Sequence, residues 1–290
     1  MRSTRMPAAL TAGQTKQTVT QAAPLRPQRD PALRLTSFAD DEDWRAVLAA
    51  ARAPGTPLPQ RWESLFGPLI HLKPDETRVV GQLGQSLDGR IATVSGHSKY
   101  INGFGCLSHL HRLRAVCDVV VVGAGTAIAD DPQLNVRLVE GPNPARAIID
   151  PSGRVPRDLR LFDDDGVRRI IITAADTQGD WPEGVEVLRL ARLAGGGLCP
   201  LAIVKALAKA GLRRILIEGG SQTISRFITA RALDRLHLLI APMIIGAGKM
   251  GLELSPIQTL QEALRPRMTA HQAGDEVLLD CDLRSCEIYS

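Results

Sequence analysis

The sequence lacks several features that would limit its function at once. Its five cysteines include no Cys-x-x-Cys pair, so the ligand spacing of the common zinc sites is missing. No apolar run approaches the roughly 20 residues needed to cross a bilayer, and the N-terminus has no apolar signal segment. We therefore expect a soluble, cytoplasmic protein with reduced thiols and no membrane partner.

The charge balance argues against a further class of partners. Lys and Arg number 35 against 31 Asp and Glu, and they are scattered rather than gathered into a stripe that follows a phosphate backbone. His109 and His111 are two residues apart, which points their side chains to different faces of a helix. We expect neither a nucleic-acid partner nor a metal site, while 44% hydrophobic residues suffice for a substantial core.

The N-terminal part of the chain changes character near residue 35. Residues 1–34 have no apolar period and no acid before Asp30, which predicts a disordered tail. Organelle transit peptides share this acid-poor composition, but the segment has no convincing amphipathic helix. In residues 35–76, Trp44, Val47 and Leu48 are spaced like one helical face and prolines follow, so we expect an extension of short helices.

The main domain is expected at residues 77–290, where β-branched runs alternate with helical stretches. This alternation predicts an α/β fold with a mostly parallel central sheet and helices on both faces. The run Glu276–Leu283 predicts a late antiparallel edge strand. The other strands are expected at Val79–Leu83, Val119–Val122, Ala147–Ile149, Ile170–Thr173, Val185–Leu190, Ile215–Glu218 and Leu236–Ile240.

A glycine-rich turn follows the second of these strands, in the run VVVVGAGTAIADDP that ends at Pro132. Gly123 and Gly125 suggest a turn whose backbone N–H groups approach a phosphate. A third glycine is absent, and Asp130 follows Gly125 by only five residues, whereas the ribose-binding acid of a Rossmann domain comes about 20 residues later. A classical Rossmann assignment therefore fails.

A second glycine pair lies in ILIEGGSQTISRF, which begins at Ile215. A buried strand ends in Glu218, and the helix that follows offers free N–H groups to a phosphate or pyrophosphate. The alternative is a plain strand-to-helix connection with Ser221 as the helix cap. Because ligands of open α/β sheets collect at the carboxyl ends of strands, Glu218 favours a binding site.

A third segment, SLDGRIATVSGHSKYI at residues 86–101, has turn residues at Asp88-Gly89 and Ser95-Gly96. By itself this pattern is typical of a β-hairpin.

In order and spacing, these segments together resemble the reductase domain of the riboflavin-biosynthesis deaminase-reductase, which has a dihydrofolate-reductase-like fold. The resemblance spans roughly residues 77–284. Its motifs are SLDGRIAT-x-SG-x-S-x-x-I at 86–101, HRLRA at 111–115, VGAGTAIADDPQLNVR at 122–137, IEGGSQT at 217–223 and IAPMIIG at 240–246. The deaminase half is absent, since no His-x-Glu followed by Pro-Cys-x-x-Cys occurs.

The resemblance implies a set of site residues. Those near the NADPH cofactor are Gly84, Tyr100, Thr126, Asp130 and the segment Gly220, Ser221, Gln222, Thr223, Ile224, Ser225 and Arg226. Those around the substrate are Ser98, Arg114, Leu134, Arg137 and Glu218. Two positions depart from the family pattern: Tyr100 stands where Trp is common, and Ser221 where Pro is frequent.

The activity implied is NADPH-dependent reduction of 5-amino-6-(5-phosphoribosylamino)uracil to its ribitylamino product, by a homodimer. Arg114 and Arg137 suit the substrate phosphate, and Asp130 and Glu218 are the candidates for proton transfer. Asp131, before a proline, is expected to start an Asx turn. The alternatives are a reductase of the same fold acting on another pyrimidine or a pterin-like heterocycle, or a non-catalytic nucleotide-binding partner protein.

Overall fold

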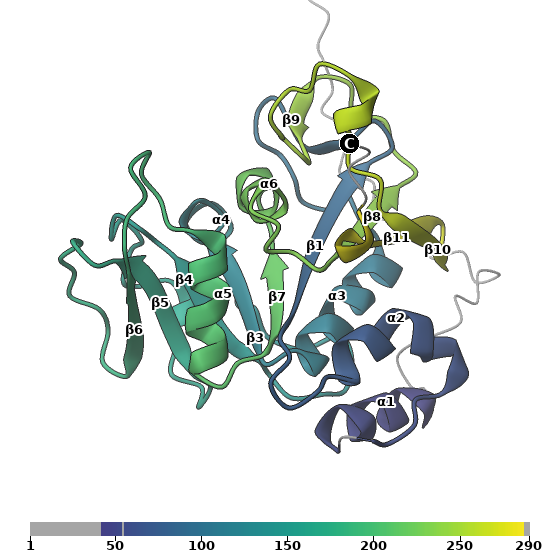
Figure 1. The fold of residues 1–290 in the computed structure, drawn as a ribbon, viewed down its shortest axis with the longest axis horizontal. Helices are drawn as coiled ribbons and strands as arrows, with labels where there is room; N and C mark the ends of the chain where they lie inside the picture. The colour runs from purple at the N-terminus through teal and green to yellow at the C-terminus, as the bar shows by residue number, and fades with distance from the viewer. Residues whose placement is uncertain (1–41, 54, 287–290) are drawn as a thin grey trace, which may run out of the picture. The chain divides into compact units, whose positions relative to one another are not determined.

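The computed structural model describes residues 42–53 and 55–286, so the tail expected at residues 1–34 lies outside the described residues. A central sheet of nine strands runs in the order β10-β11-β8-β1-β7-β3-β4-β5-β6 (Figure 1). Its strands are β1 (Arg78–Ser86), β3 (Val119–Gly123), β4 (Ala145–Ile149), β5 (Arg169–Ala174), β6 (Val185–Leu190), β7 (Arg214–Glu218), β8 (Arg235–Ala241), β10 (Arg267–Ala273) and β11 (Glu276–Asp282).

The strands from β8 to β6 are parallel, and β11 and β10 are added in antiparallel orientation. The α/β fold with a mostly parallel sheet is therefore confirmed. One detail differs from the expectation, because β11 lies between β8 and β10, and β10 is the edge. The β10 segment carries no clear strand signal, since its run RMTAHQA mixes polar and apolar residues and is largely exposed.

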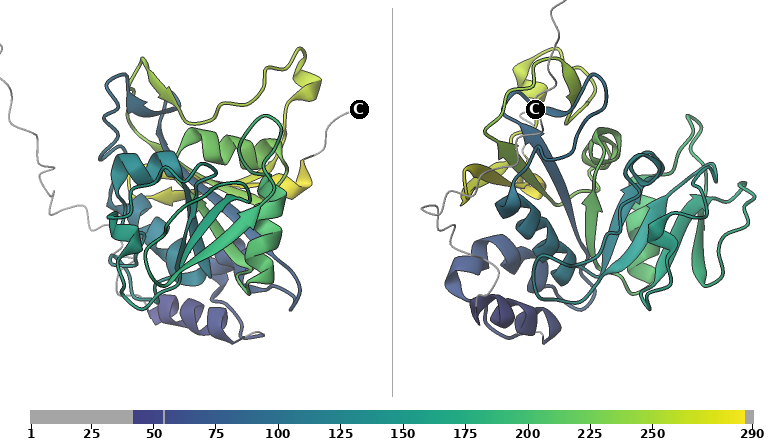
Figure 2. Two further views of the ribbon diagram at one scale, coloured as in Figure 1. Left: turned by 90° about the vertical axis from the view of Figure 1, so that its left-hand side faces the viewer. Right: turned by 180° about the vertical axis from the view of Figure 1, so that it is seen from behind.

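Helices cover both faces of the sheet (Figures 1 and 2). Alternate residues of β3 show this division, because Val120 and Val122 belong to one buried cluster and Val119 and Val121 to the other. The first cluster includes residues of α3 (Phe104–Val116) and α4 (Ala124–Asp130). The second includes residues of α5 (Pro200–Lys209) and α6 (Ser221–Thr229). Short 3₁₀ turns lie at Arg160–Phe162, Leu260–Glu262 and Leu283–Ser285.

Two helices precede the sheet, α1 (Glu42–Arg52) and α2 (Gln60–Ile70), and both pack into the first cluster. Trp44, Trp62 and Phe66 form a tilted aromatic group with ring centroids 5.5–6.1 Å apart. The guanidinium of Arg112 on α3 lies over Trp44 at 5.4 Å and over Trp62 at 5.1 Å. Cation–π and apolar contacts thus dock this extension on α3.

A separate two-stranded sheet pairs β2 (Arg90–Thr93) with β9 (Gly248–Met250). The prediction that residues 86–101 form a β-hairpin is wrong, because β2 pairs with the distant strand β9 and not with a strand next to it in the sequence. Both expected turns exist: the N–H of Gly89 donates to Ser86, and that of Gly96 to Thr93, at 3.0 Å each. No helix among the described residues has the length and hydrophobicity to cross a membrane.

Candidate functional site

The carboxyl ends of four neighbouring parallel strands meet at one edge of the sheet. In the register of the sheet Gln82 pairs with Glu218, and Gly123 pairs with Ile149. Gly84 lies two residues beyond Gln82 on β1. The edge therefore gathers three of the segments that the sequence singled out, at the place where open α/β sheets bind ligands.

The turns that follow β3 and β7 touch each other through glycines. A Cβ added to Gly123 would lie 2.5 Å from Oγ1 of Thr223, and one added to Gly219 would lie 2.8 Å from Cγ2 of Thr126. The N–H of Gly220 donates to Oγ1 of Thr126 at 3.2 Å. Gly219 also has a φ of 80°, which side chains rarely tolerate. These positions require glycine because the two turns approach so closely.

Helix α6 begins at this contact with Gly220 as its N-cap, and no side chain caps it. Ser221 is the first helical residue, not the cap, so the alternative reading of this serine is wrong. Its hydroxyl is fully buried and has no hydrogen-bond partner among the described residues. The first turn carries no acid, so its N–H groups and positive dipole suit an anionic group.

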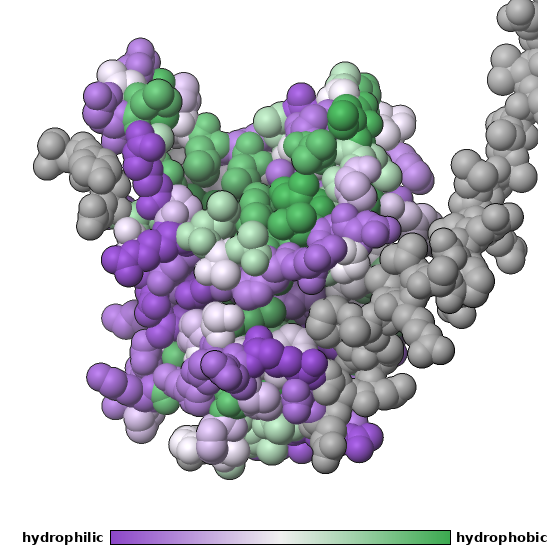
Figure 3. All heavy atoms as spheres, turned by 90° about the vertical axis from the view of Figure 1, so that its right-hand side faces the viewer, coloured by the Kyte–Doolittle hydropathy of each residue, from purple (hydrophilic) through white to green (hydrophobic). Residues whose placement is uncertain are grey.

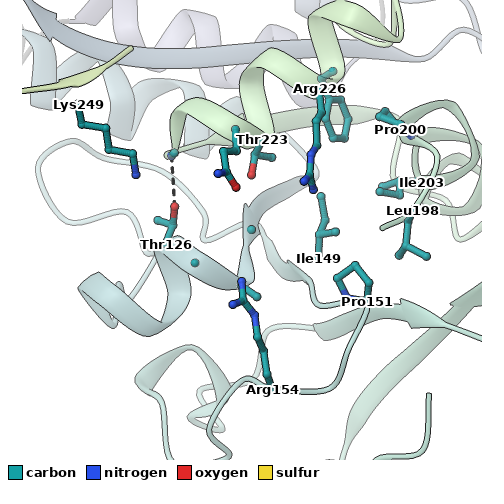
Figure 4. A pocket seen from close by; sticks show the side chains of 16 residues that line it. Thr126, Ile149, Pro151, Arg154, Leu198, Pro200, Ile203, Thr223, Arg226 and Lys249 are labelled. Atoms are coloured by element: carbon teal, nitrogen blue, oxygen red, sulfur yellow. Dashed lines mark hydrogen bonds between the residues drawn. The ribbon is translucent and has the colours of Figure 1, made fainter. Parts of the chain in front are cut away.

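A pocket opens between these turns and the segment after β4 (Figure 4). Arg154, Arg226 and Lys249 extend into it from three different segments, and none of its lining residues is acidic. Its apolar wall consists of Ile149, Pro151, Leu198, Pro200, Ile203 and Phe227. Cationic side chains suit phosphate groups, and an apolar wall suits a flat ring. The pocket therefore fits a ligand that carries phosphates as well as a ring, such as a dinucleotide.

Sequence reasoning missed Arg154 and Lys249. Arg154 lies in the turn Pro-Ser-Gly-Arg just after the parallel strand β4, a position from which it could have been inferred. Lys249 lies on β9, which is three residues long and shows no strand pattern in the sequence. Only the pairing of β9 with β2 reveals that Lys249 belongs to the pocket.

Beside the pocket, a buried ion pair joins α3 to the end of β7. Nε and Nη2 of Arg114 donate to the two oxygens of Glu218, each at 2.7 Å, and Nη1 donates to the carbonyl of Asn135 at 2.9 Å. Both residues are buried, with Arg114 6% and Glu218 5% exposed. The structure thus turns Arg114 toward Glu218, whereas the sequence suggested that it meets a substrate phosphate.

Arg137 is exposed and lies nearby on a largely half-buried segment that also contains the buried Leu134. Its backbone N–H donates to Nδ1 of His111 at 3.0 Å, and its Nη1 donates to Oδ1 of Asn135 at 2.9 Å. Burial and the neighbouring Arg114 lower the pKa of Arg137, Glu218 opposes this by raising it, and Arg160 lowers it by a smaller amount. Arg114 is already neutralised by Glu218, so the guanidinium of Arg137 is the cation available to an anion here.

The two aspartates at the end of α4 differ in their surroundings. Asp130 is the last residue of α4, the helix that begins directly after β3, and it is exposed. Asp131 has a left-handed backbone with φ 38° and accepts from the backbone N–H and Nε of Arg160 at 2.8 and 2.9 Å. Its side chain therefore ties α4 to the turn at Arg160 rather than forming the local Asx turn that the sequence predicted.

The last two expected site residues lie on the loop that follows β2. Ser98 is exposed, and Tyr100 is 86% exposed with a φ of 68°. At the other end of β2, Asp88 accepts from Ser86 Oγ at 2.6 Å and from two backbone N–H groups of the segment before β9, at Ile245 and Gly246. These hydrogen bonds lower the pKa of Asp88 to about 2.

This edge, with its phosphate-compatible helix start beside a buried Arg–Glu pair, gives the chain the architecture of an α/β domain whose ligands bind at the carboxyl ends of parallel strands. The model of the RibD C-terminal domain matches residues 77–279, and the chain belongs to this family. The family resemblance expected from the motifs is thereby confirmed.

Two relatives by sequence are similar over most of the domain. The 2,5-diamino-6-ribosylamino-4(3H)-pyrimidinone 5′-phosphate reductase of Methanothermobacter thermautotrophicus is 30% identical over 212 residues, which cover 70% of this chain and 96% of that protein. The riboflavin biosynthesis protein RibD of Aquifex aeolicus is 33% identical over 187 residues, 63% of this chain. The match spans about half of that relative, 51% of its length.

Solved structures show the same architecture. The diaminohydroxyphosphoribosylaminopyrimidine deaminase/5-amino-6-(5-phosphoribosylamino)uracil reductase of Thermotoga maritima aligns with a TM-score of 0.62 at 27% identity, over 72% of this chain and 57% of that one. The riboflavin biosynthesis reductase Rib7 of yeast aligns with a TM-score of 0.59 at 22% identity, over 73% of this chain and 92% of that one. The second likeness supports the fold alone.

Proposed function

We propose that this protein uses NADPH to reduce the ribosyl group of 5-amino-6-(5-phosphoribosylamino)uracil to the ribityl group. The observation that carries the proposal is the position of the cationic pocket directly beside the Arg114–Glu218 pair at one sheet edge. The similarity to reductases of phosphoribosylaminopyrimidines supports the substrate class.

The choice of NADPH over NADH is supported by the charges of the pocket. Arg154 and Arg226 lie on opposite sides of its opening, and Lys249 lies near the start of α6 (Figure 4). An NADH site places an acid on the ribose hydroxyls, whereas a 2′-phosphate is accommodated by arginine. The N–H groups of Ser221 and Gln222 at the start of α6 are proposed to hold the pyrophosphate, since the N–H of Gly220 donates to Thr126 and that of Thr223 donates to the carbonyl of Gly220.

On the substrate side, Arg137 is proposed to bind the phosphate, with Ser98 and Leu134 at the edges of the site. Both oxygens of Glu218 already accept from Arg114, so its remaining lone pairs suit acceptance from a sugar hydroxyl. Arg114 is proposed to support the substrate through Glu218 rather than to hold the phosphate.

When bound, NADPH would supply a hydride for C1 of the sugar, and the bond from C1 to the ring oxygen would break as the ring opens. The freed oxygen then needs a proton. Asp130, exposed at the end of α4, is proposed to deliver it, directly or through water, because a carboxyl group can act as a general acid.

The test mixes purified protein, NADPH and the aminouracil phosphate and follows the absorbance of the reduced nicotinamide. Turnover with formation of the ribitylamino product supports the proposal. A second arm uses 2,5-diamino-6-ribosylamino-4(3H)-pyrimidinone 5′-phosphate, the substrate in the name of the Methanothermobacter relative. Turnover of the second compound alone would move the substrate to the diaminopyrimidinone, and turnover of neither would refute the proposal.

We also propose that two copies associate through one face of the strands β8, β11 and β10. The register places on this face Leu238, Ile240, Val277, Leu279, Met268 and Ala270. Met268 is 58% and Val277 39% exposed, and Figure 3 shows apolar side chains gathered on this side of the molecule. An apolar face suits a symmetric dimer. Analytical ultracentrifugation should show a dimer that Met268→Asp converts to a monomer.

A further inference from the structure

Glu276 begins β11 and is 5% exposed, yet its carboxylate binds a segment far away in the sequence. Its Oε2 accepts from the backbone N–H of Gly103 at 2.9 Å, and its Oε1 accepts from Nδ2 of Asn102 at 2.9 Å. Gly103 is the N-cap of α3 and has no side chain to cap the helix. Glu276 therefore supplies, from a distant strand, the acceptor for the N-cap N–H that an N3 glutamate provides in a capping box, and it places a negative charge at the start of α3.

The contact with Asn102 also fixes the orientation of its amide. Because Nδ2 donates to the carboxylate, Oδ1 must point the other way. It points at Gly84 on β1, where an added Cβ would lie only 1.8 Å from Oδ1 of Asn102. Asn102 is thus held between a buried carboxylate on β11 and a glycine at the candidate site.

Asn102 ends an exposed loop, residues 94–103, which connects β2 to α3. At the start of this loop, Thr93 holds the chain by three hydrogen bonds. The N–H of Gly96 donates to the carbonyl of Thr93, the N–H of His97 donates to Oγ1 of Thr93, and the N–H of Thr93 donates to the carbonyl of His97. At its end, Asn102 and Gly103 bind Glu276. Between these two anchors lie Ser98 and Tyr100, both exposed, so the position of their side chains depends on the anchors.

We infer that Glu276 is a positioning residue, which acts through Asn102 to hold the 94–103 loop against Gly84 and so presents Tyr100 to the cofactor. The inference rests on the proposed use of NADPH and on the place beside the cofactor that the family resemblance implies for Tyr100. The anchor itself is a structural relationship that does not depend on the substrate.

An exchange of amide and carboxylate tests this relationship. Glu276→Gln lets Oε1 accept from Gly103 but turns its NH₂ toward the NH₂ of Asn102, so two donors face each other. Asn102→Asp brings two carboxylates within hydrogen-bond distance. The double variant Glu276→Gln/Asn102→Asp restores one donor and one acceptor, because the amide introduced on β11 donates to the carboxylate introduced at the end of the loop.

Binding of NADPH is measured by its fluorescence in a titration of the full-length protein. Each single variant should weaken NADPH binding about tenfold, the effect of losing one charge-assisted hydrogen bond, and the double variant should recover to within about twofold of the unchanged protein. The affinity of Asn102→Asp should improve as the pH falls, because one shared proton relieves the repulsion. In a Tyr100→Ala background, Glu276→Gln should have little further effect.

The control is Glu262→Gln, since Glu262 caps the exposed turn after Thr259 and contacts no site residue in the hydrogen bonds of the described chain. A double variant that binds NADPH no better than the weaker single variant would overturn the inference, as would full additivity with Tyr100→Ala.

Limited proteolysis provides a readout without cofactor. Trypsin should cleave after the exposed Lys99 several times faster in Glu276→Gln and at nearly the original rate in the double variant. Unchanged cleavage in both single variants would show that Glu276 does not anchor the loop. Absence of NADPH binding by the unchanged protein would instead refute the proposed function, and proteolysis would still decide the anchor.

Discussion

Arg114 and Glu218, 104 residues apart in the sequence, form a fork-to-fork ion pair with both N–O distances at 2.7 Å. The pair connects the last turn of α3 to the carboxyl end of β7, immediately before the glycine pair that starts α6. Glu218 neutralises a buried guanidinium, and in the proposed site it also presents its remaining lone pairs to the substrate. A substitution there affects stability as well as turnover.

Glu218→Gln should reduce both the free energy of unfolding and the turnover. The amide leaves the charge of Arg114 without its counter-charge in a site where both side chains are 7% exposed, and breaking such a pair costs about 3 kcal/mol or more. Urea denaturation measures the change. Glu186→Gln is the matched control. Glu186 and its partner Arg168 are each 42% exposed, and an exposed ion pair contributes at most about 1 kcal/mol to the free energy of unfolding. Equal losses in the two variants would contradict the buried role.

Replacing both members of the pair separates stability from binding. Arg114→Leu/Glu218→Leu removes both buried charges together, and hydrophobic replacements of similar volume are often neutral in stability. We expect the double variant to be more stable than Glu218→Gln but to turn over no faster than that variant. Recovery of turnover would exclude Glu218 from the substrate site.

The sequence predicted the central strands well because each is a short buried run of Val, Ile or Leu, as in β3 and β5. It did not predict β10, whose exposed, mixed residues form a strand only by pairing with β11. The same limit applies to the site. Motifs located Glu218 and Arg114, but their mutual contact depends on how α3 crosses the end of β7, which no local pattern contains.

Arg154 should determine the preference between the two nicotinamide cofactors. Arg154→Ser removes a guanidinium from the wall of the pocket, so the KM for NADPH should rise about tenfold or more while that for NADH changes little. Steady-state kinetics with both cofactors measure this. Arg168→Ser is the control for net charge, since Arg168 precedes β5 at the opposite edge of the sheet and pairs with Glu186. A parallel rise for NADH would place Arg154 outside the 2′-phosphate site.

His111 should make the protein less stable in mild acid. Burial, with Arg114 and Arg137 nearby, lowers the pKa of His111 from 6.5 to about 3. Between these two values the unfolded chain binds a proton that the folded chain refuses, so stability falls as the pH decreases below 6.5, by up to about 1.4 kcal/mol per pH unit. Above pH 6.5 this contribution is constant.

His111→Asn isolates the effect, because its amide oxygen can still accept from the N–H of Arg137 and does not titrate. The slope of the unfolding free energy between pH 6.5 and 5 should decrease relative to the unchanged protein. His97→Gln, at an exposed position, should leave the slope as it was. Identical slopes in all three proteins would show that His111 is protonated in the folded state.

Truncation should distinguish the two parts of the N-terminal region. Deletion of residues 1–34 is expected to leave the melting temperature and turnover unchanged, because their composition offers little apolar surface to bury. Deletion of residues 1–76 also removes Trp44, Trp62 and Phe66, which are at most 5% exposed, and should lower the melting temperature strongly. A large drop for the shorter deletion would contradict the prediction of a disordered tail.

Arg137 should act on the substrate phosphate. A phosphate clamp stabilises the ground state and the transition state alike, so Arg137→Met should chiefly raise the KM for the phosphorylated substrate and leave kcat and the affinity for NADPH nearly unchanged. One lost charge-assisted contact costs about 1.5–3 kcal/mol, which corresponds to a rise of about ten- to a hundredfold. The backbone N–H that binds His111 remains, so the fold should be retained.

The dephosphorylated substrate is the decisive comparison for this variant. Its use by the unchanged protein should already be weak, and Arg137→Met should barely change it, because the group that Arg137 binds is missing from the start. Arg168→Met provides the same change in net charge at a remote, exposed position. Equal losses with both substrates would indicate that Arg137 has a structural role, such as holding Asn135, and a selective loss of NADPH affinity would assign it to the cofactor.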